Sequence, residues 1–168
     1  MPKQKIVIYG DEVLRTQCTP VKEITAELRE FIAEMFVVLK RVKGLGLSAP
    51  QVGRTERFFI LDMSSVSLEH DRVVMINPEI VTTSGEQCGE EGCLSFPGLF
   101  LEVTRPSEVV CRYIDLDGQV RTVRAEGLFA RAILHENDHL NGVLFIDHIE
   151  PAERELIAGK LKKIKVSA

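Results

Sequence analysis

Two histidines in the run H-E-N-D-H, at positions 135–139, constrain this chain more than any other feature. Four residues of an α-helix turn through about 400°, so both imidazoles project from one face, one turn apart. This spacing lets His135 and His139 bind the same metal ion. Glu136 is offset by about 100°, beside the ion, where a carboxylate can hold and deprotonate a water molecule. The alternative is a helix with two hydrogen-bonded core histidines and an incidental glutamate.

A catalytic metal site also needs a third protein ligand and an open position. Upstream, Cys93 lies in the glycine-rich segment 89–98, and its thiolate would bind a divalent ion tightly. Downstream, His148 and the carboxylates of Asp147 and Glu150 are ligands of the kind that zinc peptidases use. The residues alone leave both sources of the third ligand open.

The segment G-L-G-L-S-A-P-Q, at positions 44–51, is the third feature with chemical meaning. It is not a dinucleotide-binding fingerprint, because the third glycine is missing and no helical pattern follows. Two glycines beside an apolar, strand-like stretch suit a peptide that docks edge-on as an added strand. Gln51 would then present its side-chain amide N–H to that peptide. A loop that simply packs into the core is the alternative.

Length and charge limit the class of protein. The chain has 168 residues and a formal net charge of −4, from 21 basic and 25 acidic side chains. This length predicts one domain, residues 1–168, and the charge argues against a surface built throughout to grip nucleic acid. No apolar run approaches the roughly 18 residues that span a bilayer, and no secretory signal is visible. We therefore expect a cytoplasmic protein with neither DNA nor a membrane as its partner.

The cysteines fit the same compartment. Four cysteines in a chain without an export signal are expected to be reduced thiols and not a disulfide framework. We interpret Cys18 and Cys111 as small buried residues. We interpret Cys88, five residues before Cys93, as a bystander thiol.

Hydrophobic periodicity predicts an α+β fold. Helical spacing of apolar residues occurs in 25–42, where Thr25 can cap the start and Gly44 can end the helix, and again in 126–140. Pro151 begins a final amphipathic helix that carries Leu156 and Leu161. Between these helices lie short β-type runs, with an Asp-Gly hairpin signal at 117–118. The predicted strands are 58–61, 73–76, 80–83, 109–114 and 120–123.

Three blocks together resemble the peptide deformylase family. That family is marked by the forms G-x-G-[LI]-[AS]-A-x-Q, E-G-C-L-S and H-E-x-D-H-L-x-G. Here they stand in the same order at 44–51, 91–95 and 135–142, and the flanks agree, so the resemblance covers nearly the whole chain. It implies antiparallel β-sheets packed around a central helix that carries the histidines, with a C-terminal helix outside.

The resemblance also implies a reaction and roles for particular residues. The reaction is hydrolysis of a linear amide: the N-formyl group is removed from the initiator methionine of nascent polypeptides, and formate is released. The implied metal ligands are Cys93, His135 and His139, with Glu136 as general base and acid. The Gln51 amide and the Leu94 backbone N–H are the implied oxyanion donors. Family members typically use Fe(II); Zn(II), Ni(II) or Co(II) would also suit these ligands.

The substrate contacts are carried over in the same way. The peptide is expected to dock along Leu45 and Gly46, and Gly92 lets the backbone approach it closely. A pocket for the methionine side chain is lined by the metal helix before its first histidine. The positions implied for it carry Leu128, Arg131 and Ala132, and Arg131 departs from the family, which has an apolar residue there. We expect Arg131 to lie at the rim, with its stem packed and its guanidinium in water.

Two further hypotheses concern charged residues. Asp138 could pair with Arg105 and so orient the metal helix, or it could be an ordinary solvated carboxylate. The lysines of 160–165 could simply complement the dipole of the last helix, or they could contact ribosomal RNA, since some family members act at the ribosome through a C-terminal helix. The rival functions are a metallopeptidase with a downstream ligand and a ribosome-associated module with a structural metal site.

Overall fold

A computed structural model describes residues 3–66 and 71–167 of the chain. The expected α+β class is confirmed. The helices are α1 (Ala26–Val42), α2 (Gly127–Leu140), α3 (Pro151–Leu156) and α4 (Ala158–Ser167), with short 3₁₀ turns η1 (Glu12–Arg15), η2 (Ala49–Val52) and η3 (Phe145–His148). The strands are β1 (Gly46–Ser48), β2 (Phe58–Asp62), β3 (Arg72–Ser84), β4 (Gln87–Gly92), β5 (Phe100–Arg105), β6 (Glu108–Ile114) and β7 (Val120–Glu126). None of the helices in the described ranges has the length and apolar character needed to cross a membrane.

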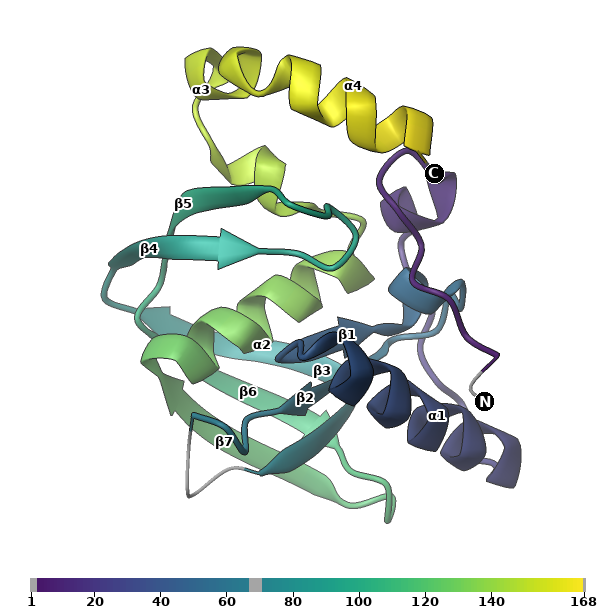
Figure 1. The fold of residues 1–168 in the computed structure, drawn as a ribbon. Helices are drawn as coiled ribbons and strands as arrows, with labels where there is room; N and C mark the ends of the chain where they lie inside the picture. The colour runs from purple at the N-terminus through teal and green to yellow at the C-terminus, as the bar shows by residue number, and fades with distance from the viewer. Residues whose placement is uncertain (1–2, 67–70, 168) are drawn as a thin grey trace.

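The strands form two antiparallel sheets with α2 between them. One sheet has five strands in the order β1-β2-β3-β6-β7, and β4 pairs with β5 in a separate hairpin. Helix α2 lies between this hairpin and the larger sheet, whereas α3 and α4 lie outside the hairpin (Figure 1). The expected arrangement around a central helix is therefore confirmed.

Two of the predicted strands are one. The runs 73–76 and 80–83 belong to β3, which continues through both with register shifts between Ile76 and Glu79 and between Ile80 and Thr82. Asn77 takes a positive φ of 50°, and its side chain exchanges two hydrogen bonds with the backbone of Val21. The strand therefore bends at a bulge and continues beyond it. At the bend, the Asn77 side chain satisfies the backbone hydrogen-bonding groups of Val21.

Strands β4 and β5 were not predicted. The β4 sequence Q-C-G-E-E-G has few residues that favour strands. In β5 the alternation is visible afterwards: Leu101, Val103 and Arg105 point inward and are buried. An arginine at an inward position obscured this period-two signal.

The helix ends follow local chemistry. Thr25 caps α1 by accepting a hydrogen bond from the Leu28 N–H at 3.1 Å, and the helix ends at Val42, both as expected. Lys43, one residue before Gly44, is the residue in the left-handed conformation at this end. The predicted last helix is instead two helices, interrupted at Ile157. Leu161 is buried but Leu156 is 86% exposed, so the prediction of Leu156 as an apolar contact was wrong.

The apolar core is divided around α2. Helix α2 contributes Phe129, Ala130, Ala132, Ile133 and Leu140 to a cluster with the five-stranded sheet. The hairpin residues Leu101 and Val103 belong to a different cluster, with η3 and α4. The face of α2 that meets the hairpin is thus the polar one.

Cys18 and Cys111 are buried, as expected, and burial raises the pKa of each thiol to about 11.

Candidate active site

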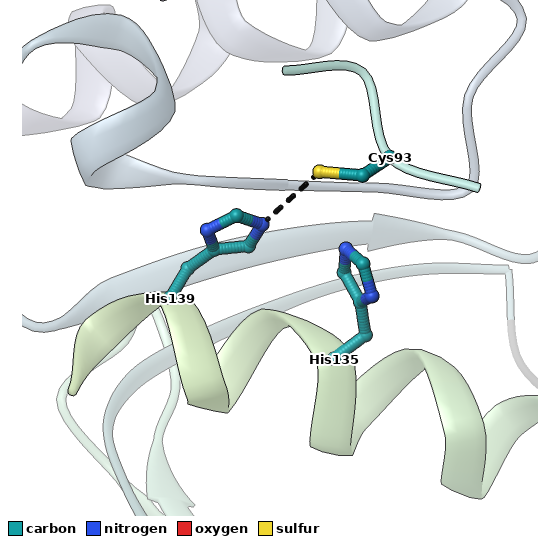
Figure 2. A group of neighbouring side chains, drawn as sticks. All are labelled: Cys93, His135 and His139. Atoms are coloured by element: carbon teal, nitrogen blue, oxygen red, sulfur yellow. Dashed lines mark hydrogen bonds between the residues drawn. The ribbon is translucent and has the colours of Figure 1, made fainter. Parts of the chain in front are cut away.

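The cysteine and the two histidines of the sequence motifs meet in one place. Cys93 follows the end of β4, while His135 and His139 project from α2 toward it (Figure 2). Their ligand atoms all lie within 4.8 Å of one another, and the Cys93 Sγ is 3.4 Å from the His139 Nε2. Among the described residues, this is the group of His, Cys, Asp and Glu side chains that could hold a metal ion.

The chemistry of this donor set fits a divalent metal ion. The Nδ1 of His135 lies 2.6 Å from the Glu91 Oε2, which leaves the Nε2 of His135 free to face Cys93. Burial lowers the pKa of His139 well below its ordinary value, so its ring is neutral, as a metal ligand requires. For His135, burial alone would lower the pKa, but contacts with Cys93 and Glu91 outweigh burial and raise it, so this ring would have to give up a proton to bind an ion. A cysteine sulfur with two imidazole nitrogens suits ferrous iron, zinc, cobalt or nickel.

Glu91 is the outer partner that sequence reasoning missed. Burial by itself raises the pKa of this carboxyl, but hydrogen bonds from Arg105 and His135 outweigh burial and hold the pKa well below its ordinary value. Glu91 therefore stays ionised and accepts the proton on the His135 Nδ1. The available signal was its place in the E-G-C-L-S block, two residues before the cysteine.

Glu136 is a buried carboxylate beside the ligand group. Its Oε1 has no hydrogen-bond partner among residues 3–66 and 71–167, and burial raises its pKa to about 7. A methyl group at Gly46 would approach the Oε2 of Glu136 to 2.6 Å, so the glycine leaves room for this side chain. A carboxyl with a pKa near neutrality can both take and return a proton.

The orientation of the Gln51 amide follows from its partners. Its Oε1 accepts hydrogen bonds from the Ser48 N–H and hydroxyl, both at 3.0 Å. Because a backbone N–H can only donate, the oxygen must face Ser48 and the Nε2 must face the other way. That Nε2 lies 3.6 Å from the Cys93 Sγ and 3.1 Å from the Ser95 Oγ. The amide N–H groups therefore point toward the ligand group.

A cavity of about 510 Å³ opens beside these groups, within the size range of small-molecule and peptide sites. Its lining includes Gln51, Cys93, Leu94, His135 and Glu136. The expected substrate-contact residues also line it: Leu45, Gly46, Gly92, Leu128, Arg131 and Ala132. His139 is 1% exposed and lies behind this lining. The fold thus brings the sequence-predicted site residues together.

One of these expectations was wrong in its detail. Arg131 does not extend its guanidinium into water, since the residue is only 6% exposed. Its Nη1 donates to the Glu91 Oε1 at 3.0 Å and to the Val103 carbonyl at 2.9 Å. The buried carboxylate of Glu91 holds the guanidinium inside.

Charged residues around α2 answer two other expectations. The Arg105 Nη1 donates to the Asp138 Oδ2 at 2.9 Å, which confirms that pairing. His148 lies 2.8 Å from the same carboxylate, and Asp147 pairs with Arg15 at 2.6 Å. These two downstream residues lie outside the ligand group, which Cys93 completes instead.

Comparisons with known proteins agree with this geometry. The family model described as polypeptide deformylase matches residues 3–155. A peptide deformylase of Hydrogenovibrio crunogenus is 44% identical over 163 residues, covering 97% of this chain and 95% of that protein. A crystal structure of a peptide deformylase from Legionella pneumophila has a TM-score of 0.89 at 38% identity, covering 96% of this chain and 95% of the other. The corresponding structure from Thermotoga maritima has a TM-score of 0.83 at 40% identity, covering 88% and 98%.

Proposed function

The chain belongs to the polypeptide deformylase family and removes the N-formyl group from the methionine of nascent polypeptides, and we propose that the cavity beside α2 is where it does so. The observation that carries this proposal is the meeting of three ligand atoms within 4.8 Å beside the buried Glu136. Metallopeptidase activity and a purely structural metal site are not favoured, because the relatives are peptide deformylases over nearly their full length.

Cys93, His135 and His139 would hold one divalent metal ion, most suitably Fe(II). Such an ion would act as a Lewis acid: it would polarise the formyl carbonyl and lower the pKa of a nearby water molecule. Zn(II), Ni(II) and Co(II) suit the same ligands. Glu91 keeps the His135 ring oriented by accepting its Nδ1–H.

The chain's own residues carry the proton and the developing charge. Glu136 accepts a proton from the attacking water and later donates it to the leaving amine nitrogen as the C–N bond of the formyl group breaks. Negative charge builds on the formyl oxygen earlier, as the water oxygen bonds to the carbonyl carbon and before the C–N bond breaks. The Gln51 Nε2–H and the Leu94 backbone N–H donate to this oxygen. Formate and a peptide with a free N-terminal methionine result.

The substrate peptide docks between two free strand edges. In the part of the chain that the structure describes, β1 is the end strand of the larger sheet, and β4 pairs with β5 alone. Leu45 and Gly46 on one side and Gly92 on the other line the cavity between them. A peptide in this position extends the sheet by backbone hydrogen bonds, which suits nascent chains of any sequence. Leu128, Ala132 and the stem of Arg131 receive the methionine side chain.

Formate release tests the proposal directly. The protein is purified without oxygen and given a short formyl-methionyl peptide, with metal content assayed in the same sample. We expect formate to be released by protein that holds about one metal ion per chain. A folded, fully metallated protein that releases no formate contradicts the proposed site.

We further propose that residues 1–168 act as one catalytic domain in the cytoplasm. Its described cysteines are free thiols, as a reducing compartment requires. Helix α4 carries four exposed lysines, at positions 160, 162, 163 and 165. They are proposed to contact ribosomal RNA through their positive charge.

Charge reversal on α4 tests the ribosome contact. Changing Lys160, Lys162 and Lys163 to glutamate is expected to weaken co-sedimentation with ribosomes at least about tenfold at low salt. With each lysine lost, binding of the protein releases fewer counterions from the RNA, and the affinity falls. Truncation after Glu150 is a poorer test, since it also removes Leu161 from the core. Formate release from a free peptide should be unchanged.

A matched control is the reversal of the three residues Arg29, Lys40 and Arg41, which are exposed on α1. This triple variant should leave ribosome binding as it is. Equal sedimentation of the α4 variant and the unaltered protein would end the proposal of ribosome contact.

A further inference from the structure

The proposed metal ligands come from two parts of the fold with separate apolar cores. His135 and His139 stand on α2, whose apolar side chains pack on the larger sheet. Cys93 follows β4, and the hairpin β4–β5 packs its apolar side chains with η3 and α4. One apolar link between them is Phe145, whose ring centroid lies 5.9 Å from that of His135 and 4.9 Å from that of Phe96 in the β4–β5 loop. Polar contacts supply a second link between the helix and the hairpin.

A buried ionic cluster joins the two parts. The Glu91 Oε1 accepts from the Arg105 Nε at 2.8 Å and from the Arg131 Nη1 at 3.0 Å. Its Oε2 accepts from the Arg105 Nη2 at 2.8 Å and from the His135 Nδ1 at 2.6 Å. The side chains of these residues are 4–8% exposed. Each bond is thus screened little by solvent, and loss of one member leaves part of the buried charge uncompensated.

The two arginines have different positions in this cluster. Arg105 stands on β5, so its fork to Glu91 stays within the hairpin, and its reach to α2 goes through the half-buried Asp138. Arg131 stands on α2 itself, one turn before His135. Its Nη1 contacts both strands of the hairpin: the Glu91 carboxylate on β4 and the Val103 carbonyl on β5. Arg131 therefore spans directly from the helix of the histidines to the hairpin that leads to the cysteine.

We propose that Arg131 is a positioning residue: it holds the hairpin against α2 and thereby sets the separation of Cys93 from His135 and His139. It also fixes the Glu91 carboxylate so that Oε2 stays on the His135 Nδ1–H. This inference rests on the proposed metal site, because it assigns the distance between the ligands of that site. Arg131 itself touches neither the metal nor the formyl group.

The test replaces Arg131 by methionine, which keeps an unbranched apolar stem and removes the fork of donors. Co(II) is the probe, because its electronic spectrum reports ligand geometry and its affinity can be measured by competition with a chelator. We expect Arg131→Met to bind Co(II) about 10–100-fold more weakly, as for loss of other partners that orient metal ligands. Its thiolate-to-cobalt and d–d bands should shift. Arg131→Lys, which keeps the charge but not the fork, should recover only part of the affinity.

Arg121→Met is the matched control. Arg121 stands on β7 and pairs with Asp115 at 2.8 Å, but its side chain is 55% exposed, whereas that of Arg131 is 8% exposed. This variant should keep the affinity and spectrum of the unaltered protein. Circular dichroism of the metal-free variants shows whether each is folded. If Arg131→Met does not fold, Arg131→Lys carries the comparison.

Two outcomes separate this inference from the proposed function. A folded Arg131→Met or Arg131→Lys variant with unchanged Co(II) affinity and spectrum overturns the positioning role, even if KM for formyl peptides rises. Arg131 would then act only as a wall of the pocket. If the unaltered protein binds Co(II) no better than Cys93→Ser does, the proposed metal site itself is wrong.

Discussion

Replacing Glu136 with glutamine is expected to lower kcat for formate release by about 10²–10⁴-fold, the contribution typical of a general acid–base residue. The amide has nearly the shape of the carboxyl group but cannot take a proton from water. Because Glu136 is not among the ligand atoms that meet within 4.8 Å, metal content should stay near one ion per chain. The measurement is steady-state formate release alongside metal analysis of the same preparation.

The control for this substitution is Glu79→Gln, the same chemical change at an exposed position on β3. It should leave both kcat and metal content unaltered. If Glu136→Gln retains full turnover, another group moves the proton. If it loses the metal as well, Glu136 belongs to the ligand set, and its assignment as base is wrong.

Replacing Cys93 with serine is expected to remove the metal. A serine hydroxyl stays protonated at neutral pH and cannot replace the thiolate. We expect affinity for Fe(II) or Zn(II) to fall by more than the roughly hundredfold that loss of an outer partner can cost. Formate release should fall in parallel. The fold should persist, because the change is nearly isosteric and Cys93 is only partly buried.

Cys88→Ser is the matched control, since Cys88 is an exposed thiol on β4, the strand that Cys93 follows. It should leave metal affinity and turnover unchanged. Metal content after gel filtration against a chelator distinguishes the two variants. A Cys93→Ser protein that keeps its metal and its activity would place the third ligand elsewhere in the chain.

Much of the candidate site could be predicted because its functional residues lie in short segments of the sequence. The helical period places His135 and His139 on one face whatever surrounds them. The E-G-C-L-S and G-L-G-L-S-A-P-Q blocks likewise contain Cys93 and Gln51 within a few residues of the backbone that positions them. The structure places all four side chains around one cavity or directly behind it.

The surroundings of the site could not be predicted in the same way. Strand β4 has little intrinsic preference for extended structure and is held by its pairing with β5. At the break, Ile157 and Leu161 pack with the apolar cluster of η3 and β5, whereas Leu156 is exposed. Secondary-structure propensities depend on the residues of a segment and show neither the pairing of β4 with β5 nor the packing of Leu161.

Arg131 shows which structural features depend on the local sequence and which depend on tertiary contacts. The sequence by itself determined that this residue lies on α2, one turn before the first histidine, because helical geometry depends only on neighbours along the chain. Only the tertiary structure decided that its guanidinium is buried. Its partners Glu91 and Val103 lie 40 and 28 positions away. A charge leaves water only where a fold has already assembled its counter-charge, so its burial is decided by long-range contacts and not by the segment that carries it.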